Sequence, residues 1–386
     1  MIQELRIYAL RNIQQASLDL QHCNLFIGKN GSGKTSLLEA VFLLSRGKSF
    51  RHHEPKRYIT HHAKACTVWA KTHDQTLAIQ KQLDAANLAT TTLKLNNSTV
   101  PSQSALSFAL PTLLIDPTSM ALLEEGSGVR RQLLDWLSFH VEPDFYPQWL
   151  AYQRLLKQRN ALLKSPSLTL HEVSAWDHQL AIHAKALHHY RLAVFNEWQV
   201  LFDEMIGHLL PAYEGQIALS YSAGFDKQAG LFEVLQHRLS QDKELGYTRV
   251  GAHRADVVVS LKNTNDHGDK LREQAVNVLS RGEKKLLITA LRLSQLQMMC
   301  VRLPDIEPVV LIDDLDAELD DRAIDILLDA LLVLPCQLFI TSLQTDTIGK
   351  IQQKMTALNN NNDALKVFHV EQGKVSEMLS PSSLKY

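Results

Sequence analysis

The sequence predicts an α/β fold with a parallel sheet and a mainly helical second lobe. A glycine-rich loop at residues 28–35 lies between a short apolar segment and an amphipathic one. An apolar run at residues 308–312 ends in two carboxylates, and such unbroken apolar runs are typical of parallel strands covered on both faces. Between these motifs, apolar side chains in residues 119–208 recur at steps of three or four, which indicates helices.

The glycine-rich loop matches the phosphate-binding pattern G-x-x-x-x-G-K-[ST] at every fixed position. It consists of Gly28, Lys29, Asn30, Gly31, Ser32, Gly33, Lys34 and Thr35. Its glycines let backbone N–H groups converge on a phosphate, and Lys34 adds a positive charge. The Thr35 hydroxyl is the expected ligand of Mg²⁺. The sequence therefore predicts a site for the phosphates of a nucleotide and for Mg²⁺, with the N-terminus of the following helix under the phosphates.

Composition limits the possible classes of protein. The 386 residues are 45% hydrophobic and 21% charged, with a net charge of −1, so nucleic-acid binding would need a local basic patch. We find no secretory signal and no apolar run of membrane-spanning length, and we expect a cytoplasmic protein without a membrane partner. The four cysteines lack C-x-x-C spacing, as in a reducing compartment. Adjacent histidine pairs point in different directions, so we expect no metal site there.

In the N-terminal third, we expect strands at residues 2–9, 16–20 and 24–27 and a helix at residues 36–44. A basic segment at residues 45–58, broken by glycine and proline, is expected to be a surface loop. Its candidate DNA-binding cations are Arg46, Lys48, Arg51, Lys56 and Arg57, and Phe50 or Tyr58 could pack on a base or sugar. A solvated loop with ordinary surface charges is the alternative.

Short antiparallel strands and then helices follow. We expect strands at residues 66–71, 76–83, 90–95 and 113–115, and helices that include residues 148–164 and 173–205. The last two helices should form an antiparallel hairpin, either a projecting arm or, the favoured alternative, the core of a helical subdomain. A strand at residues 217–221 and a helix at 231–239 follow. Arg249, His253 and Arg254 lie in a polar loop that either touches phosphate or makes a structural turn.

The last third carries two further motifs. Ser280 and Glu283 form a predicted capping box before a helix at residues 284–300, whose exposed N–H groups could also bind an anion. The strand at 308–312 delivers Asp313 and Asp314 to the edge where α/β sheets bind ligands. One carboxylate could hold Mg²⁺ beside Thr35, and the other could orient or deprotonate water. The remaining expected elements are a helix at 321–333, a strand at 337–341, a polar tract at 359–362 and a hairpin at 367–375.

This order of motifs resembles the ABC-type ATPase heads of the SMC superfamily and, within them, the RecF family of bacterial recombination and replication-repair proteins. The resemblance implies a P-loop NTPase fold. Residues 1–115 and 301–386 would form a mixed α/β nucleotide-binding lobe, and residues 116–300 a mainly helical lobe. The segments that carry it are residues 10–12, 28–35, 130–135, 251–256, 279–283, 311–320 and 368–375.

The resemblance implies an ATP-dependent homodimer. The signature residues Ser280, Arg281 and Gly282 of one subunit would contact ATP held by the loop of the other. Asp313 would be the acid beside Mg²⁺ and Asp314 the catalytic acid. Many relatives in the superfamily carry Glu where this chain has Asp314, and Asp is one methylene shorter. We therefore expect slow hydrolysis that works as a switch, in a weak ATPase that DNA stimulates.

The resemblance also implies a biological role. Such proteins bind single-stranded, gapped or junction DNA, act with the RecR and RecO proteins to help load recombinase, and support the SOS response. Transporter ATPases usually carry a His after the last core strand, where this chain has Thr341 and Ser342. The alternatives are the ATPase subunit of a membrane transporter and a non-hydrolysing structural clamp. The missing His argues against the first, and the intact Lys34 and acidic pair argue against the second.

Overall fold

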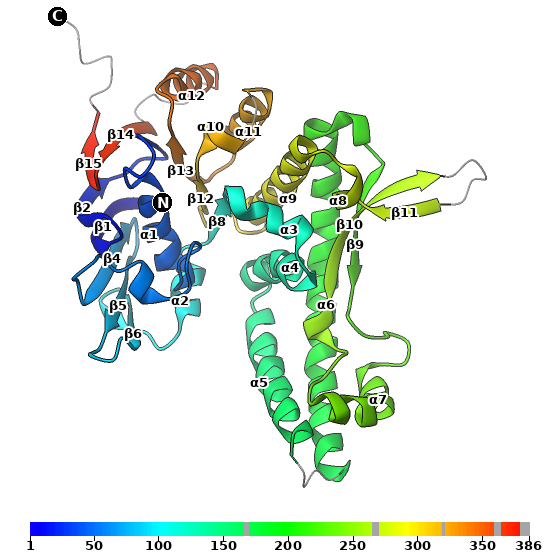
Figure 1. The fold of residues 1–386 in the computed structure, drawn as a ribbon. Helices are drawn as coiled ribbons and strands as arrows, with labels where there is room; N and C mark the ends of the chain where they lie inside the picture. The colour runs from blue at the N-terminus through cyan, green and yellow to red at the C-terminus, as the bar shows by residue number, and fades with distance from the viewer. Residues whose placement is uncertain (166–169, 265–269, 319–320, 359–363, 379–386) are drawn as a thin grey trace, which may run out of the picture. The chain divides into compact units, whose positions relative to one another are not determined.

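The computed structural model describes residues 1–165, 170–264, 270–318, 321–358 and 364–378 (Figure 1). The chain divides into two compact units, one from Met1–Ser119 with Leu303–Tyr386 and the other from Met120–Arg302. Among the helices described, none is both long and apolar enough to cross a membrane. The predicted polar tract at 359–362 lies outside the described residues, as do Leu319, Asp320 and part of the predicted turn at 165–167.

The first unit contains an antiparallel sheet whose strands alternate buried and exposed residues. Leu5 and Ile7 point into the core while Arg6 and Tyr8 face outward, as the period of a strand requires. The strands are bonded in the order β2-β1-β4-β5-β6-β7, and the predicted strands in this region are confirmed. They are β1 (Ile2–Leu10), β2 (Ile13–Asp19), β4 (Ala65–Thr72), β5 (Thr76–Leu83), β6 (Ala89–Leu95) and β7 (Ser98–Thr99).

The second sheet of this unit is mainly parallel and buried, as its apolar strands predict. Its order is β15-β14-β3-β13-β12-β8, with only β15 antiparallel to its neighbour among the pairings described. The strand that leads into the phosphate loop is not adjacent to the acidic strand, because β13 lies between β3 and β12. The strands are β3 (Cys23–Ile27), β8 (Thr112–Ile115), β12 (Val309–Ile312), β13 (Gln337–Ser342), β14 (Leu365–Glu371) and β15 (Lys374–Glu377).

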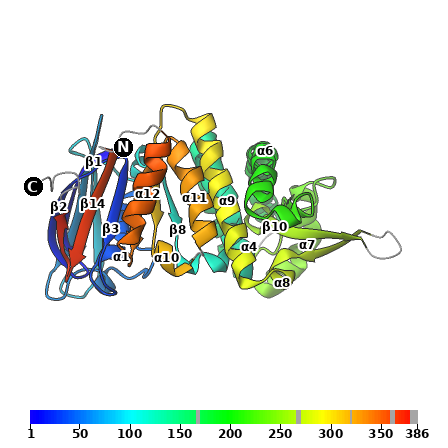
Figure 2. The ribbon, with the colours of Figure 1, turned by 90° about the horizontal axis from the view of Figure 1, so that it is seen from above.

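Helices complete the first unit, and one apolar core joins α1 to both sheets. The helix α1 supplies Leu37, Leu38 and Val41 to this core, all fully buried. Figure 2 shows α11 and α12 side by side, where they pack on each other. The sequence analysis did not predict α2, α10 or α12. The helical elements are α1 (Lys34–Arg46), η1 (Pro55–Arg57), α2 (Gln103–Ala109), η2 (Pro117–Met120), α10 (Leu315–Glu318), α11 (Asp321–Val333) and α12 (Asp346–Ala357).

The second unit is mainly helical, with a three-stranded sheet ordered β11-β10-β9. Its helices are α3 (Ala121–Glu124), α4 (Ser127–Val141), α5 (Phe145–Leu163), α6 (Leu170–Leu209), η3 (Pro211–Tyr213), α7 (Leu231–Leu245), η4 (Ala252–Arg254), α8 (Ala275–Val278) and α9 (Arg281–Arg302). Its strands are β9 (Ile217–Ser222), β10 (Asp256–Thr264) and β11 (Lys270–Gln274), and the last was not predicted.

The predicted helical hairpin is confirmed, since α5 and α6 pack along each other (Figure 1). The apolar stripe of α6 is buried, with Leu180, Leu187 and Trp198 each 0% exposed, which favours a subdomain core over a projecting arm. Arg159 of α5 is also fully buried and pairs with Asp177 at 2.5 Å and Asp242 at 2.8 Å. Removing this arginine would leave the buried carboxylates of Asp177 and Asp242 without their cation, so the cluster fixes how the helices pack.

Candidate nucleotide-binding site

The phosphate loop connects β3 to α1, as predicted, and two of its glycines are required by geometry. Gly33 precedes the first turn of α1 with a φ of 117°, a region that favours glycine. A Cβ at Gly28 would lie 2.2 Å from the carbonyl oxygen of Val370 in β14, which is too close for any other residue. Because α1 begins at Lys34, the free N–H groups of its first turn and its dipole favour an anion at the loop.

Two turns hold the loop from outside. The Gly373 N–H, in the turn between β14 and β15, donates to the Ser32 carbonyl at 2.7 Å. Asn12, in the turn between β1 and β2, donates through Nδ2 to the same carbonyl at 3.0 Å. The loop is therefore fixed by segments near both ends of the described chain.

A cavity of about 580 Å³ opens at the loop. It is lined by Arg11, Asn12, Asn30, Gly31, Ser32, Gly33, Lys34, Thr35, Ser36, Arg51 and Asp314. The structure thus brings the predicted loop and the predicted catalytic acid to one space, from positions far apart in the chain. The buried Ser32 hydroxyl has no hydrogen-bond partner among the described residues, which leaves it available to a ligand.

Lys34 is buried behind the loop, with 4% of its surface exposed. Its ammonium donates to the carbonyls of Gly28 at 2.7 Å and Lys29 at 3.2 Å. Burial lowers the pKa of Lys34, while the nearby carboxylates of Asp314, Asp313 and Asp316 oppose the shift. Among the described residues, this buried ammonium has only neutral carbonyls as hydrogen-bond acceptors, so it gains from an arriving phosphate, because hydrogen bonds between two charged groups are stronger.

Asp313 follows β12 and is 8% exposed. Its Oδ1 accepts hydrogen bonds from the hydroxyls of Thr35 at 3.0 Å and Thr341 at 2.9 Å. Burial raises the pKa of Asp313 to about 6, and the Asp314 carboxylate adds to the rise, while both hydroxyls oppose it. A nearby cation would relieve this cost of burying charge.

The residues present fit Mg²⁺. Thr35 and Asp313 are the predicted metal ligands, and the structure brings their oxygens together, which is the hard donor set that Mg²⁺ prefers. Asp314 is half-buried next to them, and its Oδ1 is buried without a partner in the described part of the chain. An unpaired buried carboxylate oxygen is costly, and such groups concentrate at functional sites.

Thr341, one of the two residues at the place where transporter ATPases usually carry a His, touches both acids. Besides its bond to Asp313, its Oγ accepts the N–H of Asp314 at 2.7 Å. From the sequence, Thr341 was apparent only as a departure from the transporter pattern. Arg11 was not predicted as a site residue, yet its guanidinium makes two bonds of 2.8 and 2.7 Å to the buried Glu39, and Arg11 lines the cavity. Arg11 lies in residues 10–12, one of the segments that carry the resemblance, and this was the signal that could have identified it as a site residue.

The predicted signature residues belong to the second unit, at the start of α9. Ser280, Arg281 and Gly282 are exposed. The capping box is confirmed, because Ser280 N–H donates to Glu283 at 2.8 Å and Glu283 N–H donates to the Ser280 hydroxyl at 3.4 Å. The Ser280 hydrogen bonds lower the pKa of Glu283. The loop and acids belong to the first unit.

The candidate DNA-binding cations have different environments. Lys48, Arg51, Lys56 and Arg57 are exposed, whereas Arg46 is half-buried and donates to the Thr112 carbonyl at 3.4 Å. Arg51 lines the nucleotide cavity. Lys56 and Arg57 both face Glu54, at 3.4 and 3.3 Å. The segment is a loop with one short helical turn, η1.

The suggested aromatic contacts in this segment need correction. Tyr58 is 1% exposed within the apolar core, so it cannot pack on a base or sugar. Phe50 is partly buried, and its ring meets Phe42 edge-on at 5.4 Å. The sequence did not reveal which side chains of the loop turn inward.

The loop at residues 249–254 contains a neutral, structural histidine. The His253 ring contacts the Tyr152 hydroxyl at 2.8 Å and the Thr248 carbonyl at 3.0 Å. Burial lowers the pKa of His253 to about 4. His253 therefore carries no charge for a phosphate at neutral pH, and the structural-turn alternative holds for this residue.

This histidine predicts a pH dependence of stability. Between pH 6.5 and 4 the unfolded chain binds a proton at His253 that the folded chain does not, so stability falls as pH falls through this window. The contribution is up to about 1.4 kcal/mol per pH unit. We expect His253→Asn to flatten urea-unfolding free energy against pH in this window. His73→Asn is the control, because His73 is 82% exposed, and an equal flattening there would contradict the assignment.

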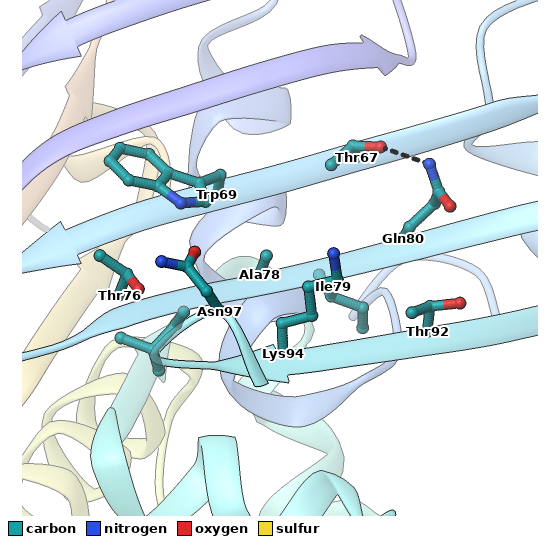
Figure 3. A pocket seen from close by; sticks show the side chains of 10 residues that line it. Thr67, Trp69, Thr76, Ala78, Ile79, Gln80, Thr92, Lys94 and Asn97 are labelled. Carbon is teal, nitrogen blue, oxygen red and sulfur yellow. Dashed lines mark hydrogen bonds between the residues drawn. The ribbon is translucent and has the colours of Figure 1, made fainter. Parts of the chain in front are cut away.

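A second hollow, of about 220 Å³, lies on the outer face of the antiparallel sheet (Figure 3). Trp69 lies against it, and Gln80 donates to the Thr67 hydroxyl at 3.2 Å. The Arg6 guanidinium lies 4.8 Å from the centre of the Trp69 ring. None of the residues lining it is a carboxylate, so it offers no acid for hydrolysis.

Comparisons with known proteins show which family the chain resembles. The family model described as RecF/RecN/SMC N terminal domain matches residues 1–366. Two relatives named DNA replication and repair protein RecF are those of Acinetobacter baumannii (strain SDF) and Cellvibrio japonicus. The first is 42% identical over 96% of this chain and 98% of its own length. The second is 35% identical over 96% of this chain and 98% of its own length.

Solved structures agree with the fold. The recombination mediator protein RecF-ATP in the RecFOR pathway matches with a TM-score of 0.78 and 21% identity, over 98% of this chain and 97% of that one. The Smc head domain of Pyrococcus furiosus bound to the C-terminal domain of ScpA matches with a TM-score of 0.56 and 14% identity, over 100% of this chain and 98% of that one.

The fold and the site together define an ABC-type ATPase head of the SMC kind. Within that class, relatives that are 35–42% identical over nearly the full length are decisive. The chain belongs to the RecF family. Because these relatives are replication and repair proteins, the transporter alternative has no support.

Proposed function

We propose that this protein is an ATP-switched DNA-binding protein of recombinational repair and replication restart. One observation carries the proposal: the phosphate loop and Asp314, whose buried Oδ1 has no partner among the described residues, line one cavity. ATP would occupy this cavity, with its phosphates on residues 28–35 and Lys34. Relatives that are named DNA replication and repair protein supply the biological context.

We infer the following division of roles at the site. Thr35 and Asp313 would hold Mg²⁺, which would supply positive charge at the phosphate oxygens. Asp314 would orient or deprotonate the attacking water, and its short side chain favours slow turnover. Ser280, Arg281 and Gly282 of a second copy would contact the bound ATP, so that ATP binding drives dimerisation. This arrangement makes a weak, DNA-stimulated ATPase that works as a switch.

The proposed DNA ligand is single-stranded, gapped or junction DNA, and the proposed location is the cytoplasm. RecO and RecR are the proposed protein partners, and helping to load recombinase and supporting the SOS response are the proposed outcomes. Binding should be tested by titrating gapped and intact duplex DNA with ATP, with ADP and without nucleotide. ATP-dependent binding with a preference for the gapped substrate supports the proposal, and equal binding in all three states contradicts it.

The exposed cations of residues 48–57 predict a salt-dependent effect. We expect the triple change Lys48→Glu, Lys56→Glu and Arg57→Glu to weaken duplex binding. For every DNA phosphate that the variant no longer neutralises, the negative slope of log affinity against log salt should become shallower by about 0.9. Arg46 is left unchanged because it is half-buried against Thr112.

Two controls keep this test specific to DNA. Nucleotide affinity should stay unchanged in the triple variant, because these three side chains do not line the nucleotide cavity. Arg51→Glu is measured separately, since Arg51 does line that cavity. A salt slope equal to that of the unchanged protein would place the DNA site elsewhere.

A further inference from the structure

Thr341 is the next-to-last residue of β13, a strand that lies between the two halves of the nucleotide site. β13 pairs in parallel with β3, which leads into the phosphate loop, and with β12, which leads into the acids. Ile340 is in register with Ile312, so the next residues along these strands, Thr341 and Asp313, meet at the same edge of the sheet. Thr341 is 0% exposed.

The hydroxyl of Thr341 bonds to both acids, once as a donor and once as an acceptor. It donates its single proton to Asp313 Oδ1 at 2.9 Å and accepts the Asp314 N–H at 2.7 Å. One side chain therefore fixes the carboxylate of the first acid and the backbone of the second. Asp313 Oδ1 also accepts the Thr35 hydroxyl at 3.0 Å, which links Thr341 to the loop.

Asp314 needs such support because its backbone conformation is unfavourable. Its φ is 52°, a left-handed value that is uncommon outside glycine, although Asp and Asn adopt it more often than other residues. Strained conformations of this kind persist only where surrounding contacts hold them. The bond from the Asp314 N–H to Thr341 is such a contact, and the conformation directs the carboxylate whose Oδ1 has no partner among the described residues.

The neighbouring Ser342 is equally buried, but its hydroxyl bonds to other residues. Its hydroxyl bonds to Asp316 and, at 2.9 Å, to the Thr347 hydroxyl. Asp316 also accepts the N–H groups of Leu343 at 3.0 Å and Gln344 at 3.3 Å. This second set shapes the segment that follows β13 and makes no bond to Asp313 or Asp314 in the part of the chain described. Ser342 is therefore a matched control for Thr341.

We propose that Thr341 is a positioning residue for ATP hydrolysis, acting through the backbone of Asp314 and the carboxylate of Asp313. This inference rests on the proposed ATPase function. Thr341 contacts the acids of its own subunit directly. It affects the hydrolytic step more than nucleotide binding, because its hydroxyl does not line the cavity.

The test compares Thr341→Val, which keeps the shape and removes the hydroxyl, with Thr341→Ser, which keeps the hydroxyl. We expect Thr341→Val to lower the turnover rate at saturating ATP at least about 10-fold, since it removes the part-buried hydrogen bond of the Asp314 N–H and the bond to the Asp313 carboxylate. ATP affinity, measured with a fluorescent ATP analogue with and without Mg²⁺, should change less than about 3-fold. Thr341→Ser and Ser342→Ala should both stay within about 3-fold of the unchanged protein in turnover.

A double variant separates positioning from a general structural role. If Thr341 acts through Asp314, Thr341→Val should cause no further loss of turnover in an Asp314→Asn background. Melting temperatures without nucleotide show whether each variant folds. If Thr341→Val does not fold, Thr341→Ser becomes the deciding variant, because it keeps the hydroxyl. A turnover rate of Thr341→Ser as low as that of Lys34→Ala would refute the inference.

The remaining outcomes are also decisive. Turnover in Thr341→Val equal to that of the unchanged protein would overturn the inference alone. Equal losses in Thr341→Val and Ser342→Ala would also overturn it, because they would show a general effect of this strand end. An unchanged protein that hydrolyses ATP no faster than Lys34→Ala would overturn the proposed ATPase function and this inference with it.

Discussion

Replacing Lys34 with alanine is expected to weaken ATP binding at least about 100-fold, a loss of about 2.7 kcal/mol. The variant removes a buried ammonium that would make charged hydrogen bonds to phosphate, each worth about 1.5–3 kcal/mol. It removes the bonds to the carbonyls of Gly28 and Lys29 as well, so the free protein is also altered. Calorimetry or a fluorescent ATP analogue measures the affinity.

The matched control is Lys29→Ala. Lys29 is exposed and belongs to the same loop, but it contributes a backbone carbonyl to the contact with Lys34. We expect its variant to bind ATP within about 3-fold of the unchanged protein. Thermal melting without nucleotide shows that Lys34→Ala is folded. Unchanged affinity in a folded Lys34→Ala variant would refute the assignment of the phosphate loop.

The second large effect is expected from Ser280→Arg, which should abolish the ATP-dependent dimer. The substitution places a long cation at the exposed start of α9, where a partner's triphosphate would have to approach the signature. Loss of the helix cap costs only about 1 kcal/mol, so the fold should survive. Light scattering after size-exclusion chromatography, with and without ATP, measures the mass in solution.

A control for the new charge is Asp144→Arg. Asp144 is exposed and precedes α5, in the same unit, without a side-chain bond to that helix. This variant should dimerise with ATP like the unchanged protein, and Ser280→Arg should still bind ATP as a monomer. A dimer of Ser280→Arg in ATP would show that the signature does not contact the nucleotide of a second copy.

Motifs with a fixed local spacing were predictable from the sequence. The loop at 28–35, the acids after β12 and the capping box at Ser280 each rely on neighbours within a few residues, so their local geometry follows from the spacing. The period of α6 predicted a helix with one buried stripe, because helical spacing alone decides which residues share a face.

Sequence alone could not predict which strands become neighbours in the parallel sheet. Thr341 reaches the acids only because β13 pairs with β12, and Arg11 reaches the cavity from the turn between β1 and β2, which belongs to the other sheet. The inward turn of Tyr58 has the same cause, because an aromatic residue in a basic loop can face either solvent or the core. Tertiary pairing decided these outcomes.

The hairpin of β14 and β15 has a consequence for synthesis. β14 pairs with β3, its Val370 carbonyl lies against Gly28, and Gly373 bonds the Ser32 carbonyl. A nascent chain that has emerged from the ribosome only as far as residue 364 has its whole glycine-rich motif but lacks the strand that completes the cradle around it. The cradle around the glycine-rich motif is therefore completed only after β14 and Gly373 have been made, later in translation than the motif itself and the two acids.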